Sequence, residues 1–128
     1  MKGLGRHLII EFYGCNPEML ANDERIKKTL LRSIEVMGGH VKGECLYKFP
    51  PYGGITLLIA IAESHVSIHT WPEHGYAAID IFTCGSNMDP WKAYDVIINE
   101  FKPRKFNVTD IRRGILEEGT VDNSHTIK

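Results

Sequence analysis

The sequence lacks the features that define several protein classes. It has three cysteines, an odd number without CxxC spacing, which disfavours a disulfide framework and a structural zinc knuckle. Fifteen basic residues against sixteen acidic ones leave a formal net charge of −1, so the overall charge does not attract nucleic acid or an anionic membrane. No apolar run is long enough to span a bilayer. We therefore expect no nucleic-acid partner and no membrane partner.

A secretion signal is also missing, because the apolar run at residues 8–10 is interrupted by Glu11. A cytoplasmic location is therefore expected. At 128 residues the chain has the length of one compact domain, and 43% hydrophobic residues supply enough apolar material for a core. We predict a single domain over 1–128, with a polar, poorly ordered tail at 117–128.

Hydrophobic periodicity and turn residues predict the element order β-α-β-β-β-β-α-β. The strands are expected at 7–13, 40–49, 55–62, 65–71, 76–83 and 105–113. One amphipathic helix should begin after Asn22 or Asp23 and end at Gly38, and a second should begin at Pro90 after Asp89. These elements predict an α+β fold, a two-layer sandwich with a mainly antiparallel sheet and two helices on one face.

Turn residues at 71–75 predict a hairpin between the strands on either side. If Thr70 pairs near Tyr76, the antiparallel register places Cys84 beside residues 62–64.

Three side chains are then expected around one point, namely Ser64, His69 and Cys84. A hydroxyl, a base and a thiol suit proton transfer and nucleophilic attack. Taken singly, each has an ordinary structural explanation, such as a turn hydroxyl for Ser64 or a small packed residue for Cys84.

Two segments carry a resemblance to a known family. The run AESHVSIHTWPEHGYAAIDIFTCG at 62–85, preceded by GRHLIIEFYGC at 5–15, resembles the prokaryotic type of S-adenosylmethionine decarboxylase. The similarity extends to DPWKA at 89–93 and so covers nearly the whole chain. The resemblance implies a pyruvoyl-dependent carboxy-lyase that makes decarboxylated S-adenosylmethionine, the aminopropyl donor of spermidine synthesis.

The same resemblance implies that the chain cleaves itself. Ser64 would attack the carbonyl of Glu63, convert the amide into an ester and become a covalent pyruvoyl group, leaving chains 1–63 and 64–128. His69 would be the processing base, and the Thr56 hydroxyl would assist it. The pyruvoyl group does the electron-sink work otherwise assigned to pyridoxal phosphate, so neither pyridoxal phosphate nor a metal is expected.

The family also implies roles in turnover and substrate binding. Cys84 would return a proton to the substrate α-carbon, and Glu73 would bind the ribose hydroxyls. Phe49 would stack on adenine, although a core phenylalanine is the alternative because PPYGG at 50–54 is one residue longer than the family pattern. Glu11 would face the site or occupy an exposed strand position.

Other interpretations stay open. Some members of this fold family decarboxylate arginine with the same pyruvoyl machinery, and the motif around Ser64 does not separate the two substrates. A non-processing homologue that only binds a ligand is a further alternative. A zinc site is disfavoured because His65 and His69 would lie about 13 Å apart on an extended chain. The family implies a homodimer of processed protomers.

Overall fold

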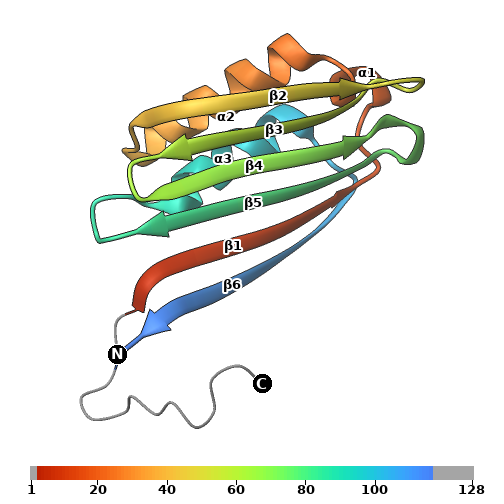
Figure 1. Ribbon diagram of the computed structural model, residues 1–128. Coiled ribbons are helices and arrows are strands. Elements are labelled where there is room, and N and C mark those ends of the chain that lie inside the picture. The colour runs from red at the N-terminus through yellow and green to blue at the C-terminus, as the bar shows by residue number, and fades with distance from the viewer. Residues whose placement is uncertain (1–2, 117–128) are drawn as a thin grey trace, which may run out of the picture.

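The structure, a computed structural model, describes residues 3–116, so the expected tail at 117–128 lies outside the described residues. Six strands form one antiparallel sheet in the order β2-β3-β4-β5-β1-β6 (Figure 1). The strands are β1 (Gly3–Tyr13), β2 (Val41–Phe49), β3 (Gly54–Ile61), β4 (Ser64–Trp71), β5 (Tyr76–Cys84) and β6 (Lys105–Ile115). The helices are α1 (Pro17–Leu20), α2 (Asp23–Met37) and α3 (Pro90–Phe101), with a 3₁₀ turn η1 at Pro72–His74.

Local capping signals set the bounds of the two long helices. The side chain of Asn22 accepts a hydrogen bond from the backbone N–H of Arg25 at the start of α2, and Gly38 ends this helix in the left-handed conformation. Asp89 caps α3 in the same way, with Pro90 at its first position. The predicted helix boundaries are therefore confirmed.

All three helices lie behind the sheet in Figure 1 and cover one of its faces. The core lies between these two layers, where every second residue of the central strands is buried. The predicted α+β sandwich is confirmed. The prediction missed α1, which has four residues and is too short to show a helical period.

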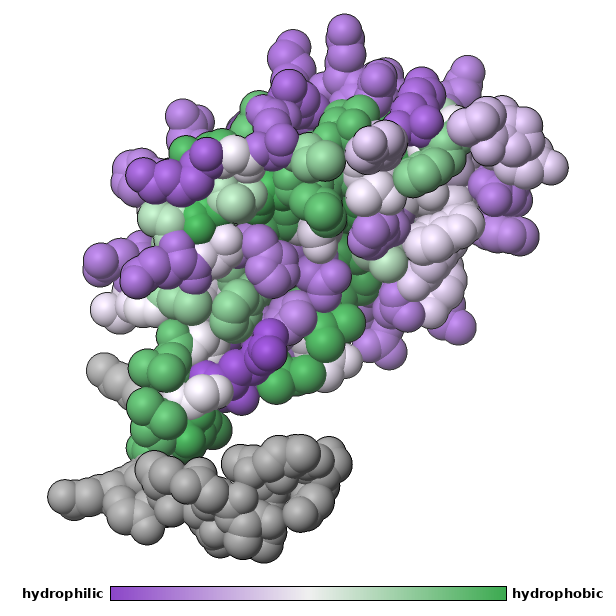
Figure 2. All heavy atoms as spheres, in the orientation of Figure 1, coloured by the Kyte–Doolittle hydropathy of each residue, from purple (hydrophilic) through white to green (hydrophobic). Residues whose placement is uncertain are grey.

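The other face of the sheet carries no helix and exposes apolar side chains. The exposed fraction of these side chains lies between 37% and 63%: Ile9, Tyr47, Phe49, Leu58, Trp71 and Ile111. Figure 2 shows apolar side chains distributed among polar ones across this face. We call it the open face. Exposed apolar surface of this kind often marks an interaction site. Within residues 3–116, no helix is long and apolar enough to cross a membrane.

Candidate active site

The hairpin register places Cys84 close to the predicted cleavage position. The observed pairs are Thr70 with Ala77 and Trp71 with Tyr76, one residue from the predicted register. Continued to the end of β5, this register sets Cys84 opposite Glu63. The expected position of Cys84, beside residues 62–64, is therefore confirmed.

The peptide bond between Glu63 and Ser64 lies in an unusual backbone. Ala62 and Glu63 form a two-residue turn between β3 and β4, and Glu63 has a φ of 64°, the left-handed region that glycine normally occupies. A side chain in this region costs about 1–2 kcal/mol. The turn therefore holds the peptide in a conformation that cleavage would release.

The Ser64 hydroxyl lies beside this peptide. Ser64 Oγ is buried and has no hydrogen-bond partner among the described residues. Leaving a buried hydroxyl unpaired costs about 1–3 kcal/mol, so structures retain such groups for a reason. An unpartnered hydroxyl next to the carbonyl of a residue in the left-handed region fits an N-to-O acyl shift, and a pyruvoyl group derived from Ser64 fits this position.

The thiols of the chain differ in their surroundings. Cys84 is half-buried beside the Glu63–Ser64 peptide, and Cys45 is exposed on β2. Cys15 is buried in the core, and burial raises the pKa of its thiol to about 11. Cys84 is therefore the thiol placed to exchange a proton near Ser64.

A second group of functional side chains lies at the other end of the hairpin. His69 pairs with Thr56 across β4 and β3, and His69 Nδ1 lies 2.9 Å from Thr56 Oγ1. Both residues line a cavity of about 190 Å³, together with Phe49, Trp71 and Glu73. This cavity is therefore lined by four of the side chains for which the family resemblance implied a role in processing or substrate binding.

Phe49 is not a core residue. Its exposed fraction is 50%, and its ring stacks on Tyr47 with the ring centroids 6.1 Å apart. The alternative of a buried phenylalanine at a strand end is therefore wrong. Glu73 lies in η1, immediately after β4, where its carboxyl group is exposed at the cavity rim.

Glu11 reaches the same end of the open face from β1. It pairs with Ala78, which pairs in turn with His69, so Glu11 and His69 are on one level of the sheet. The Tyr76 hydroxyl donates a hydrogen bond to Glu11, and burial, with this bond, raises the pKa of Tyr76. The sequence alone did not indicate Tyr76 or Trp71 as site residues. Strand alternation does place Trp71 on the same face as His69.

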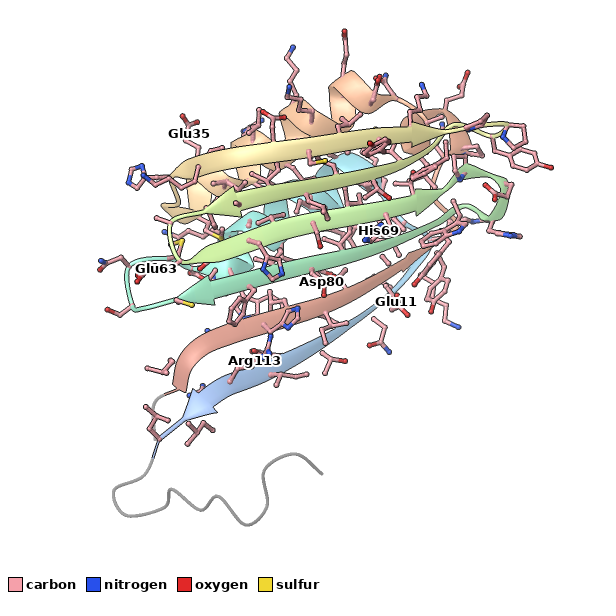
Figure 3. All side chains as sticks on the ribbon, viewed as in Figure 1. Glu11, Glu35, Glu63, His69, Asp80 and Arg113 are labelled. Atoms are coloured by element: carbon pink, nitrogen blue, oxygen red, sulfur yellow. The ribbon has the colours of Figure 1, made fainter. Side chains whose placement is uncertain are left out.

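Ser64 and His69 do not meet within one chain. They are five residues apart on the extended strand β4, a distance of about 16 Å at 3.3 Å per residue. Figure 3 shows Glu63 and His69 toward opposite ends of the sheet. The expectation that Ser64, His69 and Cys84 surround one point is therefore wrong for a single chain, because β4 does not bend back.

The chain thus carries two half-sites, at opposite ends of β4. The cleavage half-site consists of Glu63, Ser64 and Cys84, and the pocket half-site consists of Phe49, Thr56, His69 and Glu73. Among residues 3–116, no group of three or more histidine, cysteine or acidic residues is arranged to hold a metal ion.

Known proteins are similar to this chain in sequence and fold. A family model described as S-adenosylmethionine decarboxylase matches residues 6–114. An S-adenosylmethionine decarboxylase proenzyme of Thermosipho melanesiensis is 44% identical over 97% of this chain and 95% of its own length. The proenzyme of Pyrococcus furiosus is 42% identical over 99% of this chain and 90% of its own length. A crystal structure of the adenosylmethionine decarboxylase from Aquifex aeolicus superposes with a TM-score of 0.85 at 33% identity, covering 95% of this chain and 100% of that one. With the family model matching most of its length, the chain belongs to the S-adenosylmethionine decarboxylase family.

Proposed function

We propose that this chain is a proenzyme that cleaves itself between Glu63 and Ser64 and then decarboxylates S-adenosylmethionine. The observation that carries this proposal is the unpartnered hydroxyl of Ser64 beside the left-handed Glu63. Both features cost free energy in the uncleaved chain, and cleavage removes both.

The cleavage chemistry follows from these atoms. Ser64 Oγ attacks the carbonyl carbon of Glu63 and the C–N bond breaks, so the acyl group moves to oxygen and the hydroxyl proton moves to nitrogen. Loss of the Ser64 α-proton then expels the Glu63 carboxylate and leaves dehydroalanine at position 64. Hydrolysis of dehydroalanine releases ammonia and gives the pyruvoyl group.

The separation of about 16 Å between Ser64 and His69 supports a homodimer in which each active site combines half-sites from two chains. Two open faces can stack around a two-fold axis that lies between the sheets and crosses the strands. That operation reverses the strand direction, so the Ser64 end of β4 lies over the partner's His69. The exposed apolar side chains of the open face become the interface.

In this arrangement the partner's His69 is the processing base. His69 Nδ1 is hydrogen-bonded with the Thr56 hydroxyl, which leaves Nε2 to take a proton from the partner chain. The Thr56 hydroxyl fixes the orientation of the ring in this step.

The pocket half-site suits the adenosine part of the substrate. Phe49 offers an exposed aromatic face for adenine, and Glu73 offers a carboxylate that accepts hydrogen bonds from the ribose diol. The cavity holds about 190 Å³, less than the roughly 300–1,000 Å³ of a ligand pocket, so one chain encloses only part of a substrate. The rest of the substrate extends toward the partner's Ser64 and Cys84.

The pyruvoyl group supplies the electron sink for loss of carbon dioxide. Cys84 then delivers the proton to the substrate α-carbon, because it is the half-buried thiol next to position 64. Arginine has neither a diol nor a purine, and the pocket residues therefore favour S-adenosylmethionine.

The test begins with the purified chain on denaturing electrophoresis. Two fragments should appear, and mass spectrometry should find a pyruvoyl-blocked N-terminus at position 64. Ser64→Ala should stay intact, whereas the control Ser86→Ala, which changes an exposed loop serine, should cleave. An intact wild-type chain after long incubation would overturn self-cleavage.

Substrate choice is tested on the cleaved protein with carboxyl-labelled compounds. Labelled carbon dioxide should be released from S-adenosylmethionine and not from arginine. Release from arginine alone would leave the pyruvoyl chemistry standing and reject the substrate.

A further inference from the structure

Two charged groups on the open face form no direct ion pair among the described residues. Among residues 3–116 the ion pairs are Arg6 with Asp110, His7 with Asp80, Arg25 with Glu100 and Lys27 with Glu44. Neither Arg113 nor Glu11 belongs to any of these described pairs. Within the described part of the chain, the Glu11 carboxylate accepts its side-chain hydrogen bond from the Tyr76 hydroxyl. An interface that buried the open face would have to pair both charges.

Neighbouring side chains hold the guanidinium of Arg113 in a defined position. Arg113 Nη1 lies 3.4 Å from His7 Nδ1, and His7 Nε2 lies 2.8 Å from Asp80 Oδ1. The guanidinium carbon lies 4.9 Å from the centre of the Phe82 ring. A Cβ at Gly5 would come within 2.6 Å of that ring, so the glycine makes room for this stack. Arg113 is therefore a positioned cation rather than a freely moving surface arginine.

The level of the two-fold axis follows from the two half-sites. The Ser64 end of β4 can lie over the partner's His69 only if the axis crosses β4 midway between the two residues, between Val66 and Ser67. Through the ladders, Val66 is level with Leu8 on β1 and Asp110 on β6. Ser67 is level with Ile9 and Thr109 in the same way, so the axis crosses β1 between Leu8 and Ile9 and β6 between Thr109 and Asp110.

Arg113 and Glu11 lie on opposite sides of this axis. Glu11 lies two to three residues from it toward the pocket half-site, and Arg113 lies three to four residues from it toward the cleavage half-site. Figure 3 shows Glu11 and Arg113 toward opposite ends of the two strands, with Asp80 between them. Rotation about the axis therefore brings Arg113 within one residue of the level of the partner's Glu11.

We propose that Arg113 of each subunit binds the partner's Glu11 across the interface, so that the dimer contains this ion pair twice. The inference rests on the proposed homodimer and adds the contact that fixes how the two sheets face one another. Arginine matches a carboxylate with two parallel hydrogen bonds, which defines orientation as well as attraction. The Arg113 side chain is long enough to cross the spacing of about 4.8 Å between β6 and the neighbouring β1. The pair holds the register in which Ser64 meets the partner's His69.

The test is a charge reversal followed by mixing. Arg113→Glu alone and Glu11→Arg alone each place like charges opposite one another twice per dimer. Sedimentation velocity should then show a dimer dissociation constant raised at least about 100-fold for each variant. In a mixture of the two variants, the heterodimer has complementary charges at both positions. Native mass spectrometry should therefore find dimers restored and almost entirely heterodimeric.

A matched control uses the adjacent arginine. Arg112 follows the opposite alternation on β6 and pairs with Arg6, so it points away from the open face. Arg112→Glu mixed with Glu11→Arg should show no preference for heterodimers. If Arg113→Glu does not fold, Arg113→Gln and Glu11→Gln replace the reversals. Their heterodimer keeps one intact pair and should still exceed the statistical share.

The outcomes separate this inference from the proposed homodimer. A wild-type chain that is monomeric at micromolar concentration would overturn both. A wild-type dimer whose variants dimerise normally and mix in the statistical 1:2:1 ratio would overturn only the ion pair. A Glu11→Arg variant with normal dimerisation and a raised KM would likewise overturn it, in favour of a substrate contact.

Discussion

Two inactive variants, Ser64→Ala and His69→Ala, should restore self-cleavage when they are mixed. Each variant alone lacks one component of every site. In a mixed dimer, the His69→Ala chain supplies Ser64 and the Ser64→Ala chain supplies His69, so one site contains both residues. The other site contains neither. Only the His69→Ala chain is therefore cut.

The size of the effect follows from subunit exchange. Random pairing of equal amounts makes about half of the dimers mixed. About half of the His69→Ala chains, and about a quarter of all chains, should then be cleaved. If His69 acted on Ser64 of its own chain, it would have to cross about 16 Å along β4, and mixing would restore nothing.

The assay follows fragments by mass after mixing, with the two variants carrying different affinity tags so that the cleaved chain is identified. Native mass spectrometry confirms that mixed dimers are present. Mixed dimers without cleavage, or cleavage of both chains, would refute the reasoning about the two half-sites. His69→Ala that cleaves alone at the wild-type rate would remove His69 from processing.

Three further predictions concern single groups. Cys84→Ala should still cleave itself but lose decarboxylation by about 10²–10⁴-fold, measured as labelled carbon dioxide, because it removes the proton donor; equal loss of both steps would contradict this role. In the uncleaved Ser64→Ala background, Glu63→Gly should raise the free energy of unfolding by about 1 kcal/mol in denaturant titrations, because glycine adopts a φ of 64° without strain; a decrease would contradict the strain. The pKa of His65 is lowered by burial and then by His7 and Arg113, so the folded chain binds fewer protons than the unfolded one below about pH 6.5. The free energy of unfolding of Ser64→Ala should therefore rise with pH up to that value and then level off, and His65→Asn should flatten the rise; an unchanged slope would exclude His65 as its source.

The parts of the fold that could be predicted depend on local signals. Asn22 and Gly38 bound α2 because capping geometry acts over one turn of helix. The register of β4 with β5 follows from the short turn between them, which placed Cys84 within one residue.

The part of the site prediction that failed depends on the distance between Ser64 and His69 along β4. A sequence motif indicates which side chains a site needs. It does not indicate whether Ser64 and His69 act within one chain or come from two. The rise of an extended strand was enough to separate the two residues, yet their proximity in sequence suggested the opposite. The sequence did not indicate a special role for Arg113, because a single arginine on an edge strand is common and its neighbours on the sheet are known only from the structure.

The position of the strained turn decides what holds the cleaved protein together. The turn joins β3 to β4, two strands inside the sheet that remain paired from Thr56 with His69 to Ile61 with Ser64. Once the bond is cut, unfolding yields two separate chains, and refolding becomes a bimolecular reaction with an association cost of about 4–15 kcal/mol at the standard state. Recovery after heating then depends on protein concentration, whereas the uncut precursor refolds as a single chain. The proposed maturation would therefore give the protein a reactive group and remove its ability to refold as a single chain.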